Sequence, residues 1–266
     1  MKHLCSLISV ALLVTFISSS CSSNQVNGLF VHEDCPIDLP ENILTEGKFE
    51  YGYMKVPERS ALPNGNSVEL AIARFKCRQD TTKLDPLVLC SGGPGLSNID
   101  DFVPALAGGL GDLFLNDRDV VVIESRGLKY ARPYLGIPGV EQLQMELLEV
   151  DIKDVPATLT RFRDTLQVAY ERFTKDGIDL SAFNTKELSD EIVYVMNSLG
   201  YERFSIFGTS YGTEIVQYLM LNHEDKIASA VMNGTMDISR GGHDMHTGLI
   251  SHLEKYFDTI EKSPTL

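Results

Sequence analysis

The stretch FSIFGTSYGTEIVQYL, residues 204–219, decides the fold class of this chain. Its first four residues are typical of a short buried strand, and the residues from Tyr211 to Asn222 favour a helix. Between the two lies a Gly-x-Ser-x-Gly pattern centred on Ser210. Side chains near such a sharp strand-to-helix turn would clash, which explains Gly208 and Gly212. The pattern predicts that Ser210 is a nucleophile. The negative charge that develops on the substrate's carbonyl oxygen would then lie near the free N–H groups of the helix N-terminus.

A second glycine-rich run, SGGPG at residues 91–95, follows the apolar run Leu87–Cys90. An acyl-transfer enzyme needs a second backbone N–H to hold the oxyanion, and a strand-to-helix loop of this kind supplies it. Glycines let the backbone approach the substrate without a Cβ in the way. A phosphate-binding loop would need Gly-Lys-Ser or Gly-Lys-Thr, which the chain lacks. Together with the serine turn, the run indicates an oxyanion hole.

The order of the predicted elements defines the fold class. Two β-rich runs, 49–56 and 67–75, are separated by turn-forming residues and predict an antiparallel hairpin. Asn184 and Glu187 have nearly the spacing of a capping box and predict the start of a helix that ends at Gly200. The other predicted strands are 86–90, 120–123, 204–207 and 227–232, and the other predicted helices are 100–115, 155–173, 211–222 and 249–260. This alternation, interrupted by an insertion at 128–180, predicts an α/β fold with a mostly parallel sheet and helices on both faces.

Four motifs resemble those of the proline iminopeptidase and tripeptidyl aminopeptidase branch of the α/β-hydrolases. They are GYMKVPE at 52–58, GGPG at 92–95, ESRG at 124–127 and GTSYGT at 208–213. The similarity runs from about residue 47 to 238. The resemblance implies an α/β-hydrolase core over residues 46–238 and exopeptidases that release residues from peptide N-termini with a Ser, Asp and His triad.

The same resemblance implies roles for individual residues. Ser210 corresponds to the nucleophile, and Gly93 and Tyr211 offer the N–H groups of the oxyanion hole. Arg126 corresponds to a structural anchor near the site.

Two departures from the family pattern concern the oxyanion loop and its surroundings. Ser91 stands where the family more often has His, and Glu124-Ser125 stand where it more often has Asp-Gln. These changes affect the detailed geometry expected of the oxyanion loop and leave the expected class of enzyme unchanged.

The catalytic acid and base are harder to assign than the nucleophile. In this fold their order along the chain is Ser, acid, His, and the resemblance implies that both partners follow a helical cap, of which residues 239–266 are the start. Asp237 comes just after a predicted strand and could serve as the acid, whereas His243 and His246 fall at the entrance to the cap. We therefore expect the acid and the His beyond the last residue, with the final core strands and most of the cap missing. Such a core would leave a strand edge exposed.

The N-terminus is typical of an export signal. A short basic start precedes the apolar run Leu4–Ile17, which is too short to span a bilayer as a helix. Residues 1–20 are therefore predicted to be a signal peptide, and residues 21–45 an exported leader or tether. Cys21 resembles the lipidated cysteine of bacterial lipoproteins, although the residue three positions earlier is Ser and not the usual Leu. The alternative is plain secretion with an unmodified Cys21; in either case we expect the cell envelope, with lipid at Cys21 as the membrane contact.

Composition bounds the class of function. The 266 residues include 23 Lys and Arg against 37 Asp and Glu, a formal charge of −14 that opposes nucleic-acid binding. No Cys-x-x-Cys or His-rich spacing suggests a metal, and no cofactor is expected. In an oxidising compartment Cys35 and Cys77 are predicted to form a disulfide, and Cys90, in its apolar run, to be a buried thiol.

These observations predict a serine hydrolase of the aminopeptidase type that acts on peptide substrates. A second hypothesis is a catalytically incomplete or split chain, for which a partner or downstream sequence supplies Asp and His. A third is a carboxylesterase, because ester cleavage uses the same serine turn and oxyanion hole.

Overall fold

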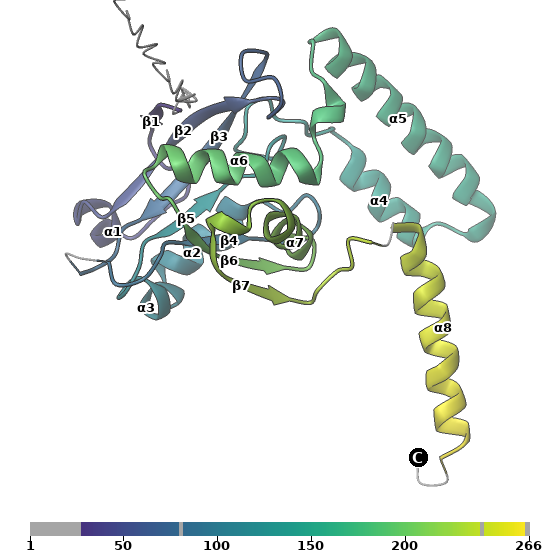
Figure 1. Cartoon of the computed structure of the whole chain (residues 1–266). Coiled ribbons are helices and arrows are strands. Elements are labelled where there is room, and N and C mark those ends of the chain that lie inside the picture. The colour runs from purple at the N-terminus through teal and green to yellow at the C-terminus, as the bar shows by residue number, and fades with distance from the viewer. Residues whose placement is uncertain (1–27, 80–81, 240–241, 264–266) are drawn as a thin grey trace, which may run out of the picture.

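The computed structural model describes residues 28–79, 82–239 and 242–263 (Figure 1). The strands are β1 (Phe30–His32), β2 (Phe49–Pro57), β3 (Ser67–Phe75), β4 (Leu87–Cys90), β5 (Val120–Ile123), β6 (Phe204–Thr209) and β7 (Ile227–Asn233). Within the described residues they form one seven-stranded sheet in the order β1-β2-β3-β5-β4-β6-β7. Strands β4 to β7 are parallel, whereas β1, β2 and β3 pair antiparallel and β3 meets β5 antiparallel. The sheet therefore has the predicted character: mostly parallel, with an antiparallel hairpin on the N-terminal side.

Helices cover both faces of this sheet. They are α1 (Glu41–Thr45), α2 (Asn98–Ala107), α3 (Leu110–Phe114), α4 (Val140–Glu149), α5 (Val155–Lys175), α6 (Thr185–Ser198), α7 (Gly212–Asn222) and α8 (Gly242–Glu261), with short 3-10 turns at Ile152–Asp154, Leu180–Ala182 and Glu224–Lys226. Helices α6 and α7 lie on one face, and α2 and α3 on the other (Figure 1). Helices α4 and α5 form a pair that extends away from the sheet, and α8 projects separately (Figure 1).

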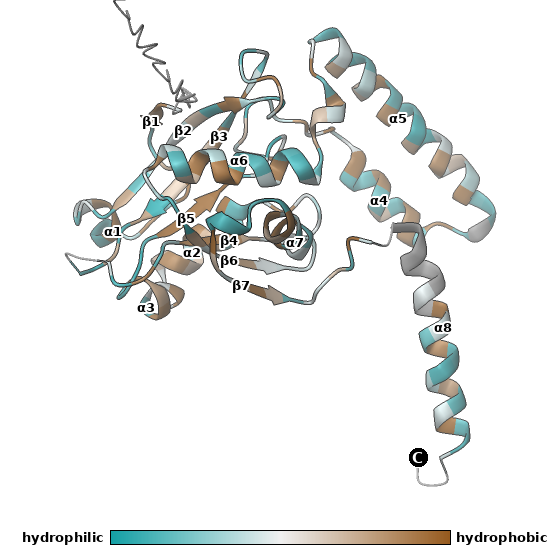
Figure 2. Ribbon diagram, in the orientation of Figure 1, coloured by the Kyte–Doolittle hydropathy of each residue, from teal (hydrophilic) through white to brown (hydrophobic). Residues whose placement is uncertain are grey.

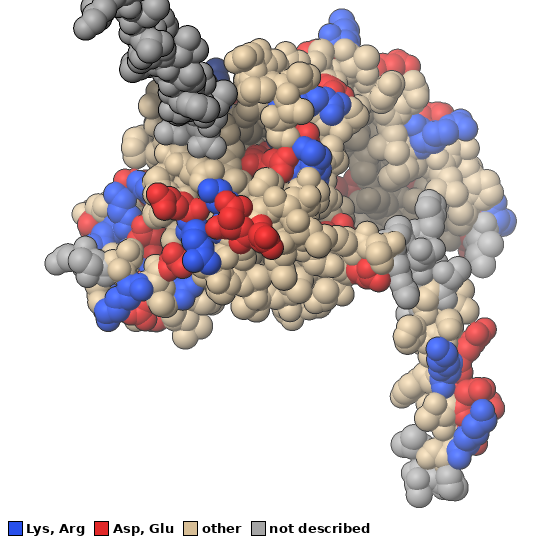
Figure 3. Space-filling view, in the orientation of Figure 1, with Lys and Arg blue, Asp and Glu red and all other residues tan. Residues whose placement is uncertain are grey.

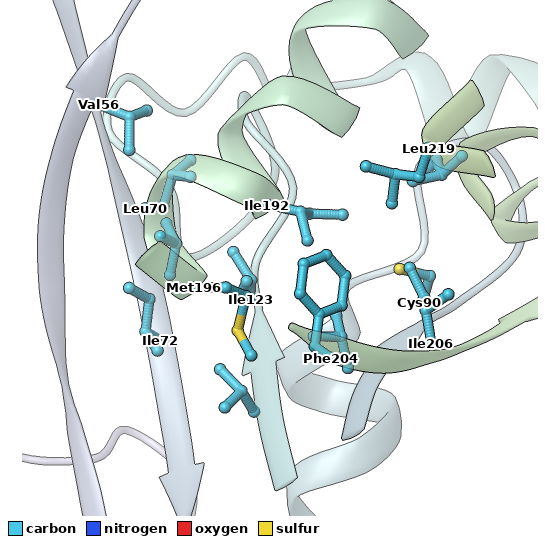
Figure 4. Close-up of a cluster of buried hydrophobic side chains, with 14 of the residues drawn as sticks. Val56, Leu70, Ile72, Cys90, Ile123, Ile192, Met196, Phe204, Ile206 and Leu219 are labelled. Atoms are coloured by element: carbon cyan, nitrogen blue, oxygen red, sulfur yellow. The ribbon is translucent and has the colours of Figure 1, made fainter. Parts of the chain in front are cut away.

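The run Val120–Ile123 shows why both faces are covered. All four side chains are buried, and alternate residues of a strand point to opposite faces. Val121 and Ile123 belong to the hydrophobic cluster that includes α6 and α7, and the other two valines to the cluster that includes α2. Figure 4 shows the first cluster, in which Ile123 lies near Phe204 of β6 and Met196 of α6. In Figure 2, β5 is brown and α6, which lies over the sheet, alternates between teal and brown along its length.

The longer predicted elements are confirmed. The hairpin is β2 with β3, paired from Phe49↔Phe75 to Pro57↔Ser67. Asn184 caps α6, where its side chain accepts a 3.1 Å hydrogen bond from the backbone N–H of Glu187. The Glu187 carboxylate accepts from the N–H of Ser60 at 2.7 Å, so it ties α6 to the end of the hairpin.

The differences from prediction are local. The helix predicted over 100–115 is divided into α2 and α3, separated by Gly108 and Gly109. A Cβ at Gly111 would collide with the carbonyl oxygen of Leu106, so the chain can turn this tightly only with glycine there. The sequence does not predict α4 inside the insertion, or β1 and α1 inside the leader. Strand β1, with 3 residues, and helix α1, with 5, carry too few periodic positions for a pattern to show.

The predicted disulfide is wrong, because Cys35 and Cys77 are both free thiols. Cys35 follows β1 and Cys77 follows β3, and β2 pairs between these strands. Two strand spacings amount to about 10 Å, which exceeds the Cα separation of a disulfide, about 7 Å at most. Cys90 is buried as predicted, and burial raises its pKa to about 12.

The predictions for the N-terminus lie outside the described residues. They are the signal peptide at 1–20, lipidation of Cys21 and the first part of the leader at 21–45. Among the helices that the structure describes, none combines the length and the apolar composition needed to cross a membrane. Within the same ranges, no three His, Cys, Asp or Glu side chains are grouped as metal ligands would be.

Strand β7 is the outer edge of the described sheet, next to β6. Its apolar side chains are partly in solvent: Val231 is 56% exposed and Met232 37%. This is the exposed strand edge that the sequence predicts.

Candidate active site

Ser210 lies on a sharp turn between β6 and α7. Its φ is +50°, a left-handed conformation that residues other than glycine rarely adopt. The Ser210 N–H donates to the carbonyl oxygen of Asn233 at 2.9 Å, which ties the turn to the end of β7. The Ser210 carbonyl accepts from the Thr213 N–H at 2.9 Å and from its hydroxyl at 2.7 Å, so the first turn of α7 holds the other side. The strained backbone is therefore fixed from two directions, with the side chain exposed.

The glycines around Ser210 are required by close backbone approach. A Cβ at Gly208 would collide with the carbonyl oxygen of Gly212. A Cβ at Gly212 would lie 2.6 Å from the carbonyl oxygen of Cys90, at the end of β4. Both contacts are too short for real Cβ atoms, so the turn has the crowding that the pattern predicts for a nucleophile elbow.

The structure brings the glycine run at 91–95 against this elbow. A Cβ at Gly92 would lie 3.1 Å from the Cβ of Ser210, so the two segments are in contact. Gly93 and Gly95 have φ values of +108° and +113°, which side chains other than glycine rarely tolerate. Gly93 is exposed beside the buried Gly92. We call residues 91–97 the oxyanion loop.

Tyr211 is the N-cap of α7, so its N–H lies at the end of that helix where backbone N–H groups have no intrahelical partner. Its hydroxyl shares a 2.9 Å hydrogen bond with the hydroxyl of Thr185, at the start of α6. Burial raises the pKa of the Tyr211 phenol, so the hydroxyl stays protonated. Its hydrogen bond with Thr185 connects the elbow to α6. Ser210 and Tyr211 follow the carboxyl end of β6, and Gly93 follows the carboxyl end of the neighbouring parallel strand β4.

Arg126 has the contacts of a structural anchor. Its side chain is buried and lies 2.8 Å from Glu191 of α6. It also donates to the carbonyl oxygens of Glu58 and Ala182, at 2.6 and 2.9 Å. Burial raises the pKa of the Glu191 carboxyl to about 7, and the Arg126 charge opposes that rise. The guanidinium joins α6, the turn after β2 and the segment before α6.

The hydroxyl of Ser210 contacts the thioether sulfur of Met236 at 3.9 Å. Met236 follows β7 and is held by α7: its N–H donates to the hydroxyl of Thr213 at 2.9 Å, and its carbonyl oxygen accepts from Gln217 at 2.6 Å. Asp237, the candidate acid, is the next residue and is exposed; its carboxylate accepts from the N–H of Ser239 at 2.9 Å.

The described histidine side chains bond elsewhere. His223 shares a 2.8 Å hydrogen bond with Asp190 at the far end of α7, about 16 Å along that helix from the elbow. His252 bonds the carbonyl oxygen of Gly248, one turn back in α8, at 2.8 Å. The side chains of His243 and His246 are not among those described. Neither of these two described histidine side chains is bonded to Ser210, whose hydroxyl contacts Met236.

Residues 85–257 match the model of the α/β hydrolase fold family. The chain belongs to this family. The match covers the elbow, the oxyanion loop and the four parallel strands that position them. A hydrolase fold is thus shown, whereas the aminopeptidase branch is a narrower assignment that the family match does not reach. A search of curated proteins found no match.

Solved structures of low sequence identity are similar to part of this chain. One is an epoxide hydrolase from Vigna radiata, 14% identical, with a TM-score of 0.39 over 70% of this chain and 39% of that chain. A protein from Pseudomonas aeruginosa, provisionally described as an epoxide hydrolase, is 17% identical, with a TM-score of 0.38 over 68% and 40% of the two chains. The chain spans less than half the length of these structures.

The chain also has a cavity of about 970 Å³ away from the elbow. It lies between β2 and α6, and its lining includes Tyr53, Pro57, Glu187 and Tyr194 but no residue of the serine turn. Figure 3 shows charged side chains of both signs on this face of the molecule. A search for the active site by cavity volume alone would therefore miss Ser210.

Two contacts at the candidate site escape sequence reasoning. Met236 carries no motif, and only the tertiary structure places its sulfur on Ser210. Glu124 is visible in the sequence as a departure from the family pattern, but its contacts with the oxyanion loop are not. An acidic residue directly after a wholly apolar strand is the signal that could have drawn attention to it.

Proposed function

We propose that this protein is a serine hydrolase that uses Ser210 to release residues from the N-termini of peptides. The observation that carries the proposal is the left-handed backbone of Ser210 at the end of β6, with the oxyanion loop in contact through Gly92. This arrangement exposes a hydroxyl beside backbone N–H groups, which is what acyl transfer requires.

The reaction follows from these positions. The Ser210 oxygen attacks the carbonyl carbon of the scissile bond, and a histidine accepts its proton while an acid orients that histidine. The N–H groups of Gly93 and Tyr211 stabilise the negative charge on the former carbonyl oxygen. The histidine then gives the proton to the leaving amine, and water releases the acyl group from Ser210. Asp237 is our candidate for the acid.

A peptide N-terminus is the proposed substrate for two reasons. The four motifs resemble those of aminopeptidases, and the formal charge of −14 attracts the ammonium group of a peptide N-terminus. The carboxylesterase hypothesis rests on the same serine turn, and a comparison of amino-acid anilides with short acyl esters separates the two. Faster turnover of the anilides supports the peptidase, and turnover of the esters alone rules it out.

A second candidate function is a chain whose proton acceptor comes from a partner or from further sequence. The contact of the Ser210 hydroxyl with Met236, in place of a histidine among the described side chains, favours this candidate. In this case the elbow would bind the substrate's carbonyl group, but catalysis would begin only when a partner or further sequence supplies the histidine.

Labelling with a fluorophosphonate probe tests the proposal. Wild type, Ser210→Ala and the control Ser251→Ala, an exposed serine of α8, are compared after circular dichroism shows that all three are folded. Labelling that disappears only in Ser210→Ala supports an activated serine with its base at hand. Folded wild type that stays unlabelled refutes independent activity and supports the second candidate.

A further inference from the structure

Glu124 is a buried carboxyl at the end of β5, beside the oxyanion loop. The residue is 0% exposed. Burial raises its pKa to about 7, although three hydrogen bonds to the carboxyl act in the other direction. Burial of a carboxyl lowers the free energy of unfolding unless hydrogen bonds or a charged partner compensate for the lost water contacts.

The contacts of Glu124 reach the last residue of the loop and the start of α2. One carboxyl oxygen accepts a hydrogen bond from the hydroxyl of Ser97. The other accepts from the N–H groups of Asn98 at 3.2 Å and of Ser125 at 3.1 Å. The carboxyl thus joins the end of β5 to the point where the loop becomes a helix.

Asn98 extends this connection to the first residue of the loop. Its side-chain oxygen accepts from the N–H of Ser91 at 2.8 Å, and its side-chain nitrogen donates to the carbonyl oxygen of Ile123 at 2.7 Å. Both ends of the oxyanion loop are therefore attached to the end of β5, through Glu124 and Asn98. Ser91 is held a second time, because its hydroxyl donates to Asp101 of α2.

The loop needs such external attachment. Gly92, Gly93 and Gly95 have no side chains with which to pack, and glycine has the largest conformational freedom of any residue. An oxyanion donor is effective only within a narrow distance of the developing charge, so small displacements reduce the rate.

We propose that Glu124 is a positioning residue that holds the oxyanion loop in place and thereby sets the location of the Gly93 N–H opposite Ser210. This inference rests on the proposed roles of Ser210 and Gly93, but its structural part concerns the loop alone. Glu124 touches no reacting atom; it acts through Ser97 and Asn98.

The attachment makes the loop sensitive to pH. A loop that opens lets water reach Glu124 and returns its pKa towards the ordinary value, so the closed loop has the higher pKa. Raising the pH through about 7 therefore favours opening, because the ionised carboxylate gains more from water than from the closed site. Asp100 of α2 is the charged group that faces Glu124, and it raises the pKa further; Lys129 pairs with Asp100 at 3.0 Å.

Amide hydrogen exchange over residues 91–98 tests the proposal without any need for turnover. Glu124→Ala removes every acceptor, and we expect the protection of the Ser91 and Asn98 amides to fall about tenfold, as the loss of one or two hydrogen bonds implies. Glu124→Gln keeps an acceptor without a charge, so it should restore protection and abolish its change between pH 6 and 8. Glu187→Ala removes a buried carboxyl of α6 as a matched control, and it should affect the Ser60 amide and leave 91–98 unchanged.

The outcomes separate this inference from the proposed function. Protection over 91–98 that is equal in wild type and Glu124→Ala overturns the positioning role, whether or not Ser210 reacts. If Glu124→Ala does not fold, Ser97→Ala removes one of the three donors, and unchanged protection in that variant overturns the role equally. Where wild type is labelled by fluorophosphonate, Glu124→Ala should lower the labelling rate, with the roughly 100-fold effect of losing one oxyanion donor as the upper limit, and Glu124→Gln should recover it. Unlabelled wild type refutes the proposed function and leaves the exchange result to decide on Glu124.

Discussion

Replacement of Ser210 by glycine should stabilise the fold relative to replacement by alanine. Both variants lose the hydroxyl, so they differ only in the Cβ carried at a φ of +50°. A left-handed conformation costs a residue with a Cβ roughly 1–2 kcal/mol, whereas the extra freedom of glycine in the unfolded chain costs about 0.4–1 kcal/mol. The difference leaves Ser210→Gly more stable than Ser210→Ala by about 1 kcal/mol.

Ser251 provides the matched control, because it is an exposed residue in the regular helix α8. There glycine should be less stable than alanine by about 1 kcal/mol, the usual order in a helix. Urea unfolding followed by circular dichroism measures both pairs. With a slope of about 2 kcal/mol per molar urea, each pair should differ in midpoint by about 0.5 M, in opposite directions.

The sign of the stability difference between Ser210→Gly and Ser210→Ala decides whether the backbone at Ser210 is strained. If Ser210→Gly is less stable than Ser210→Ala, as at a regular position, the backbone at Ser210 is unstrained and the elbow does not exist. The carrying observation of the proposed function would then be lost. If the glycine variant is more stable than the alanine variant at Ser251 as well as at Ser210, Ser251 does not lie in a regular helix and the control fails, while the result at Ser210 stands.

Three further predictions concern crowding, the anchor and pH. Gly208→Ala should lower the free energy of unfolding by about 3 kcal/mol, since its Cβ meets a backbone oxygen, while Gly109→Ala, which has open space, should be near neutral in the same urea assay. Arg126→Ala should lower it by about 3–5 kcal/mol, because Glu191 would be left buried and unpaired; a change below 1 kcal/mol would contradict the anchoring role. Since folding raises the pKa of Glu124 to about 7, the native state binds its proton more tightly and stability should fall by up to about 3 kcal/mol between pH 4.5 and 7. Thermal unfolding over this range should show a smaller fall in Glu124→Gln, and an identical pH profile would contradict the raised pKa.

The elbow is predictable from sequence because its chemistry is local. Gly208, Ser210 and Gly212 lie within one turn, and the need for glycine there arises from backbone atoms a few residues away. The same holds for the Asn184 cap, whose partner is three residues on. The run Val120–Ile123 indicates a strand covered on both faces because its side chains alternate with a period of two.

Contacts between distant residues are decided only by the tertiary structure. Glu124 and Ser97 are 27 residues apart in the chain, and Ser210 and Met236 are 26 apart. The Cys35–Cys77 prediction failed for the same reason: spacing along the chain carries no information about the strand that lies between the two residues.

The sequence by itself determined the fold class, the sharp turn at Ser210 and the glycines that surround it, since each depends on short-range sterics and on hydrophobic periodicity. Only the tertiary structure decided how the elbow is held: by Asn233 of the neighbouring strand, by Met236 over the hydroxyl, and by Glu124 behind the oxyanion loop. These contacts depend on the order in which strands pair, and strand order is set by packing of the whole sheet between its two layers of helices, which no local pattern specifies.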